Sequence, residues 1–152
     1  MASNGLRVAI QLFLWLVIIG LGYFLFYSIT EPYEAVKRAE ALTEETRSRM
    51  DVLRQVAIHY ENQYDRYPST IDSLELYVKT DSAFLTVRDS ILGPGFTADS
   101  LIFSPRNGER FVYAINDTSK VKTYLLKDPL TADSIGTVLP DDITLVNAAS
   151  WE

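Results

Sequence analysis

The feature that most constrains this chain is an uncharged apolar run near its amino end, residues 8–29. It reads VAIQLFLWLVIIGLGYFLFYSI, and only Gln11 and Ser28 in it are clearly polar. As an α-helix, this run spans about 33 Å, because each residue adds about 1.5 Å, and that length matches the hydrocarbon core of a bilayer. The run therefore predicts a transmembrane helix, preceded by a short N-terminal tail at residues 1–7.

A cleaved signal peptide is the alternative interpretation of this run. Its apolar core would hold about 7–15 residues and would follow a basic start. Here the apolar run is longer, and Arg7 is the only basic residue before it. We therefore expect an uncleaved, single-pass anchor.

The next part of the chain reads as one long helix with two different halves. Residues 30–49 are polar nearly all round, which is typical of a solvated helical stalk. From Met50 onward, apolar residues recur at three- and four-residue spacing, so one face is expected to pack on a domain. Pro68 ends this helix, and Ser69 is expected to cap a short helix that runs to about Val78.

Beyond Lys79, short apolar and β-branched runs separated by turn residues predict strands. Asn107-Gly108 is a strong hairpin signal, and residues 128–142 read as a long loop. Ile143, Leu145 and Trp151 are candidates to return to the sheet. The expected strands are residues 84–88, 101–104, 110–116 and 122–127. The predicted fold class is α+β, with an N-terminal transmembrane helix that continues into a long helix packed on a small antiparallel β-sheet, the ectodomain being residues 50–152.

Residues 59–74, HYENQYDRYPSTIDSL, carry a resemblance to a known family. The Tyr-Pro-Ser at residues 67–69, the preceding Tyr60 and the following Leu74 resemble the end of the long helix in type IV pilins and in type II secretion pseudopilins. Lys127-Asp128-Pro129 is similar to the Asp-Pro of the pseudopilin β-region. The resemblance implies a pilin-like ectodomain and a place in a secretion, pilus-like or motility machine.

The same comparison shows where the chain departs from that family. It lacks a standard prepilin leader, because Gly5 is followed by Leu6 and Ile10 stands where the family has Glu. The Trp-Gly that follows Asp-Pro in pseudopilins is replaced by Leu130-Thr131. We therefore expect a pilin-like ectodomain on a permanent anchor rather than a standard pilus subunit.

Five triplets of the form Asp-Ser-aliphatic recur along the chain, where composition alone predicts about one. They resemble the O-glycosylation sequon that Bacteroidota use on periplasmic and surface proteins. Asp-Ser pairs also favour caps and turns before apolar runs, so both interpretations stay open. The candidate glycosylated residues are Ser73, Ser82, Ser90, Ser100 and Ser134.

The residue inventory holds little catalytic equipment. The chain has no cysteine and only one histidine, His59, which excludes thiolate zinc sites, cysteine nucleophiles and His-rich metal sites. The formal net charge of −6 argues against a nucleic-acid partner. We therefore predict no enzymatic activity, and no motif indicates a small-molecule substrate.

The acidic loop after residue 127 is the candidate metal site. Calcium prefers several oxygen ligands, and the resemblance to pseudopilins implies calcium in this region. A solvated acidic turn is the alternative. The four candidate ligands are Asp128, Asp133, Asp141 and Asp142.

These patterns together predict an inner-membrane protein whose partners are membrane lipid and other membrane or envelope subunits. The excess of basic residues after the anchor, compared with the single Arg7 before it, favours a cytoplasmic C-terminal domain when counted alone. Long domains translocate largely regardless of charge, and the Asp-Ser triplets favour the periplasm. We expect a structural or scaffold component of an envelope machine; an accessory subunit of a respiratory or transport complex is the alternative.

Overall fold

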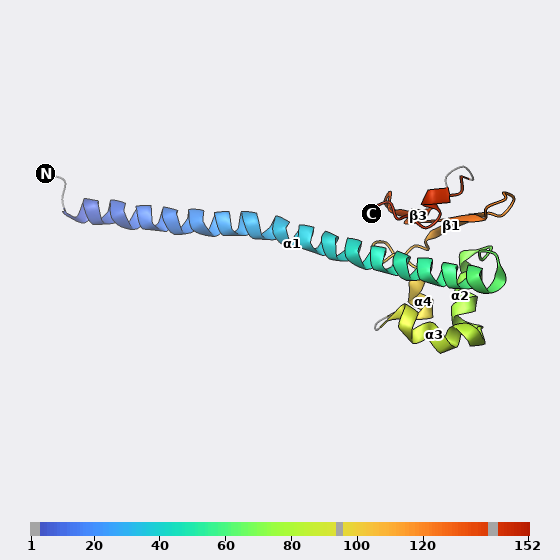
Figure 1. Cartoon of the computed structure of the whole chain (residues 1–152). Coiled ribbons are helices and arrows are strands. Elements are labelled where there is room, and N and C mark those ends of the chain that lie inside the picture. The colour runs from blue at the N-terminus through green and yellow to red at the C-terminus, as the bar shows by residue number, and fades with distance from the viewer. Residues whose placement is uncertain (1–3, 94–95, 140–142) are drawn as a thin grey trace. The chain divides into compact units, whose positions relative to one another are not determined.

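The computed structural model describes residues 4–93, 96–139 and 143–152 (Figure 1). The chain forms two compact units, Met1–Ala41 and Leu42–Glu152. The second unit combines helices with a small antiparallel sheet, so the α+β class is confirmed.

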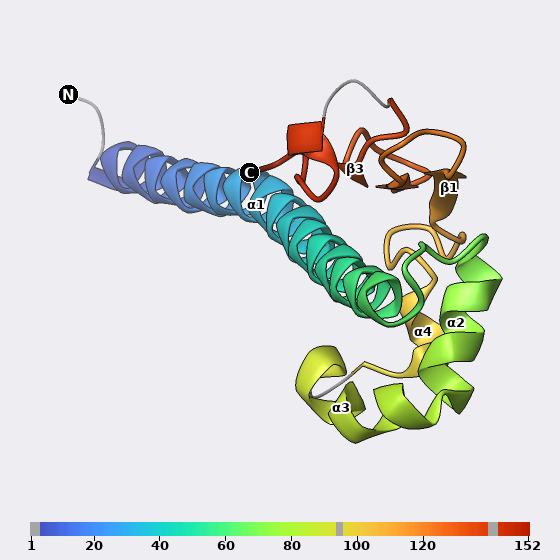
Figure 2. The same ribbon diagram turned by 45° about the vertical axis from the view of Figure 1, so that its right-hand side comes forward.

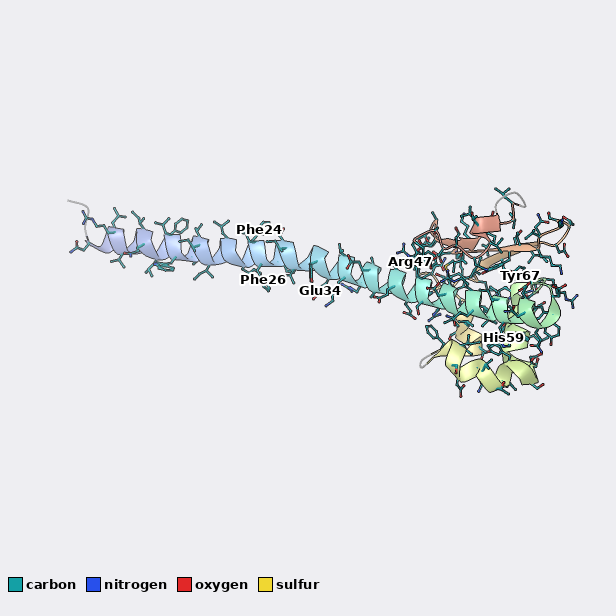
Figure 3. The ribbon with its side chains drawn as sticks, viewed as in Figure 1. Phe24, Phe26, Glu34, Arg47, His59 and Tyr67 are labelled. Carbon is teal, nitrogen blue, oxygen red and sulfur yellow. The ribbon has the colours of Figure 1, made fainter. Side chains whose placement is uncertain are left out.

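The first unit is helical wherever it is described. Helix α1 (Asn4–Tyr64) begins here, as the apolar run predicts, and its large apolar side chains are exposed. Phe24 and Phe26, for example, are 66% and 69% exposed (Figure 3). Among the described residues, this is the one helix long and apolar enough to cross a membrane.

The second half of α1 lies in the second unit and is its central element. Met50, Leu53 and Val56 are almost fully buried, which confirms the apolar face predicted from Met50 onward. The burial starts one turn earlier, because Thr46 is also buried. Its hydroxyl donates to the Leu42 carbonyl at 2.6 Å, so no unpaired hydroxyl is buried there.

Helix α1 ends four residues before Pro68. Asp65 follows it with φ of +55°, and its amide donates to the Glu61 carbonyl. Helix α2 (Ile71–Thr80) then begins one residue later than predicted. Thr70, rather than Ser69, is the N-cap, because its hydroxyl accepts from the Ser73 amide at 3.1 Å.

Two further helices replace predicted strands. Helix α3 (Ser82–Leu92) covers residues 84–88, so the strand predicted there is wrong. Phe84 and Leu92 are buried, and Val87 and Ile91 are partly buried, which is helical spacing. The Asp81 carboxylate accepts from the Phe84 amide at 3.1 Å and so caps the start of this helix.

Residues 101–104 also differ from the prediction. Helix α4 (Ala98–Leu101) includes the first of them, and Thr97 caps it. Only Phe103 forms a bridge to Arg110 across the Asn-Gly turn. The turn itself forms, with the Ser104 amide donating to the Glu109 carbonyl at 2.8 Å.

The sheet has three antiparallel strands in the order β1-β2-β3. Strands β1 (Val112–Asn116) and β2 (Thr123–Lys127) confirm the predicted strands at 110–116 and 122–127. Strand β3 (Ser134–Gly136) lies inside the predicted loop and pairs Leu126 with Ile135. The short 3₁₀ helix η1 (Ile143–Leu145) follows, so that part of the chain does not return as a strand, although Ala149 bridges Ile135.

Elements of the second unit lie on two sides of its α1 segment. Figures 1 and 2 agree that the sheet lies on one side and helices α2 to α4 on the other. Leu126 and Ile135 contribute buried side chains from the sheet, and Leu74 and Phe84 contribute them from the helices. One core cluster therefore includes the buried residues of the second half of α1 and those packed on its two sides.

Gly136 gives the first test of this packing. It has φ of +79°, and a Cβ there would clash with the carbonyl oxygens of Tyr124 and Val146. Gly108 has a similar φ of +72° but open space around it. We expect Gly136→Ala to lower the free energy of unfolding by about 2–5 kcal/mol, from backbone strain plus overpacking, and Gly108→Ala by about 1 kcal/mol.

Urea denaturation of the full chain in detergent micelles measures both variants. If Gly136→Ala and Gly108→Ala lose the same free energy of unfolding, the close approach of the β2 and C-terminal backbones to residue 136 is contradicted.

Candidate functional site

The most buried charged cluster among the described residues centres on Arg106. Its guanidinium donates to Asp128 at 2.8 Å and to Asp133 at 3.0 Å. Asp128 is fully buried, and the Arg106 and Asp133 side chains are only 10% and 13% exposed. Thr131 completes the cluster, since its amide and hydroxyl both donate to Asp128. We call these residues, together with Arg47 of α1, which binds Asp133, the arginine clasp.

The clasp joins segments that are distant in the sequence. Arg47, on α1, donates to the other oxygen of Asp133 at 3.0 Å. The Arg47 guanidinium also lies 5.2 Å from the centre of the Trp151 ring, in a cation–π arrangement. The clasp therefore connects α1, the turn after α4, the β2–β3 connection and the C-terminal segment.

The clasp sets the protonation of its two carboxyl groups. Burial acts to raise the pKa of Asp128, but hydrogen bonds from Ser104, Thr131 and Arg106 outweigh it, and the pKa lies below its usual value. Burial also acts to raise the pKa of Asp133, but the hydrogen bonds and positive charges of Arg47 and Arg106 outweigh it, so this pKa is lowered as well. Both groups are therefore held as carboxylates.

The structure describes two of the four predicted calcium ligands and places both in the clasp. Asp128 and Asp133 lie together in the clasp, where Arg106 already supplies positive charge to both. Asp141 and Asp142 lie outside the described residues. Within the part of the chain that the structure describes, no three acidic, histidine or cysteine side chains form a metal-holding group. Calcium binding stays a prediction.

The five candidate glycosylation serines lie in different local settings. Ser82 and Ser90 are exposed at the two ends of α3. Ser73 and Ser100 take part in the caps of α2 and α4, as the capping alternative predicts. Ser134 lies in β3, where its amide donates to the Ser150 hydroxyl. Glycosylation at these residues stays a prediction.

His59 belongs to an aromatic cluster between α1 and the helices that follow it. Its Nδ1 lies 2.6 Å from the Tyr77 hydroxyl, and that hydroxyl donates to Gln63 at 2.8 Å. Burial raises the pKa of Tyr77 to about 12. The Phe84 ring lies 5.5 Å from the His59 ring, nearly edge-on. These contacts tie α1 to α2 and α3.

Sequence reasoning missed the arginines that hold the clasp. Arg106 precedes the Asn-Gly turn and is 22 residues from Asp128, and Arg47 is 86 residues from Asp133. No short-range spacing links such residues. The one local sequence signal was the Asn-Gly turn, which fixes the position of Arg106 shortly before β1.

No protein-family model, curated protein or solved structure matches the chain.

Arg106→Met tests the clasp, because it leaves the fully buried Asp128 without its cation. We expect the free energy of unfolding at pH 7 to fall by about 3–5 kcal/mol, as for one broken partner of a buried ion pair. Arg110→Ala is the matched control, since Arg110 pairs with Asp72 at the exposed surface, and it should cost less than about 1 kcal/mol.

The pH dependence gives a second readout of the same variant. Carboxylates with a lowered folded pKa stabilise the fold above their unfolded pKa of about 3.9, and that stabilisation is lost as pH falls below it. The wild-type chain should therefore lose more stability than Arg106→Met between pH 6 and pH 3. A difference between the two proteins that stays constant with pH would contradict the pairing.

Proposed function

We propose that this chain is a non-catalytic, single-pass inner-membrane protein whose pilin-like ectodomain is a scaffold component of a cell-envelope secretion, pilus-like or motility machine. The observation that carries the proposal is α1 itself. Its first part exposes large apolar side chains, whereas its second part is the central element of an α+β unit.

Membrane anchoring is supported by the exposure of the apolar run. In water, this many exposed apolar side chains would be strongly unfavourable. In a bilayer the same side chains meet hydrocarbon, and the helix satisfies its own backbone hydrogen bonds. The helix is therefore suited to lipid.

A scaffold role is supported by the ion pairs and hydrogen bonds that arginines make within the second unit. From α1, Arg47 binds Asp133, and Arg54 binds both Glu152 and the Asn147 carbonyl. These contacts fasten the C-terminal half of the chain to α1. A unit fastened in this way presents a fixed surface to a partner.

The proposed periplasmic location of this unit rests on the Asp-Ser triplets. Ser82 and Ser90 are exposed, as modification would require. The resemblance of residues 59–74 to pilins and pseudopilins points to the same compartment.

Affinity purification of the full chain in a mild detergent tests the proposal. We expect it to co-purify in fixed proportion with membrane subunits of one secretion, pilus-like or motility assembly. Arg106→Met should lose these subunits, because it loosens the fold of the ectodomain, whereas Arg110→Ala should retain them. A monodisperse monomer without partners, or recovery of respiratory or transport subunits instead, would contradict it.

A further inference from the structure

A partly enclosed pocket lies within the second unit and has no role in the proposed function. Its volume is about 130 Å³. One wall comes from the end of α1 and the α1–α2 connection, through Tyr60, Arg66 and Tyr67. The other comes from β1, β2 and the turn between them, including Ile115, Asp117 and Thr123. Tyr67 is labelled in Figure 3.

The pocket offers one free charge of each sign. Arg66 and Asp117 both line the pocket, and neither forms an ion pair or side-chain hydrogen bond with any residue that the structure describes. Lys122 is the other cation of the lining, but it binds the carboxylate and carbonyl oxygens of Asp65. The charges left for a ligand are therefore one guanidinium and one carboxylate.

The remaining lining is mixed, since it includes the polar residues Ser69 and Asn116 beside apolar groups. The rings of Tyr60 and Tyr67 and the side chain of Ile115 lie around the same space. Small-molecule sites commonly combine such walls with a few polar groups that fix orientation. The lining therefore suits a ligand with a short apolar part beside its charged groups.

We infer that this pocket binds a small zwitterion of the α-amino-acid class, with its carboxylate on Arg66 and its ammonium on Asp117. A simple anion would meet the carboxylate of Asp117, and a simple cation would meet Arg66, so each is less complementary than a molecule that carries both charges. The guanidinium fork suits a carboxylate. The aliphatic side chain packs on Tyr60 and Tyr67.

Isothermal titration calorimetry of the full chain in detergent micelles tests this site, with L-valine as the probe. N-acetyl-L-valine and L-valine methyl ester each lack one of the two charges. We expect L-valine to bind and each derivative to bind at least tenfold more weakly. Equal binding of L-valine and either derivative, or no binding of L-valine, would overturn the inference.

Two variants assign the binding to the pocket. Arg66→Gln and Asp117→Asn should each weaken L-valine binding at least tenfold. Arg88→Gln is the matched control, since Arg88 is an exposed arginine of α3 outside the pocket, and it should leave binding unchanged. Arg66 and Asp117 are exposed, so their variants should fold, which circular dichroism checks. Unchanged affinity in both charge variants would overturn the assignment.

Discussion

Helix α1 has to accommodate apolar side chains in two different ways, and the rest of the structure follows from that constraint. Along its first part, large side chains such as Phe13 and Phe24 are each 66% exposed. Along its second part, Met50, Leu53 and Val56 are almost completely buried by protein. The proposed membrane anchor meets both requirements, because lipid would cover the first part while the folded unit covers the second.

The arginine clasp holds the C-terminal half of the chain against α1. Buried ion pairs contribute little net stability when compared with apolar packing, because both ions lose their hydration. Their geometry is nevertheless demanding, and Arg106 meets Asp128 and Asp133 while Arg47 shares Asp133. The clasp thus favours one arrangement of the connections around the sheet, which is the property that the proposed scaffold role requires.

The sequence predicted the elements whose signals are local. Pro68 marked the end of the long helix, and alternation marked β1 and β2. Helix α3 was missed because its apolar and β-branched residues resemble a strand, although Phe84, Val87 and Ile91 have helical spacing. Strand β3 was missed because its three residues become a strand only by pairing with β2.

The candidate sites also combine residues with a local sequence signal and residues that only the fold brings together. Asp128 and Asp133 stood out as acidic residues in one loop, but their arginine partners come from distant segments, so the sequence favoured a metal ion instead. The pocket beside Tyr67 carries no motif, since two separate connections build it. Long-range contacts of this kind need the fold before they can be seen.

We propose that residues 8–29 cross the inner membrane and leave the second unit in the periplasm, and cysteine labelling tests this most directly. The chain has no cysteine, so single-cysteine variants report cleanly on each side. In intact spheroplasts, a membrane-impermeant maleimide should label Leu130→Cys, which is exposed in the second unit, and should label Ser3→Cys only after the membrane is permeabilised. Labelling of both positions in intact spheroplasts, or of Ser3→Cys alone, would contradict the account.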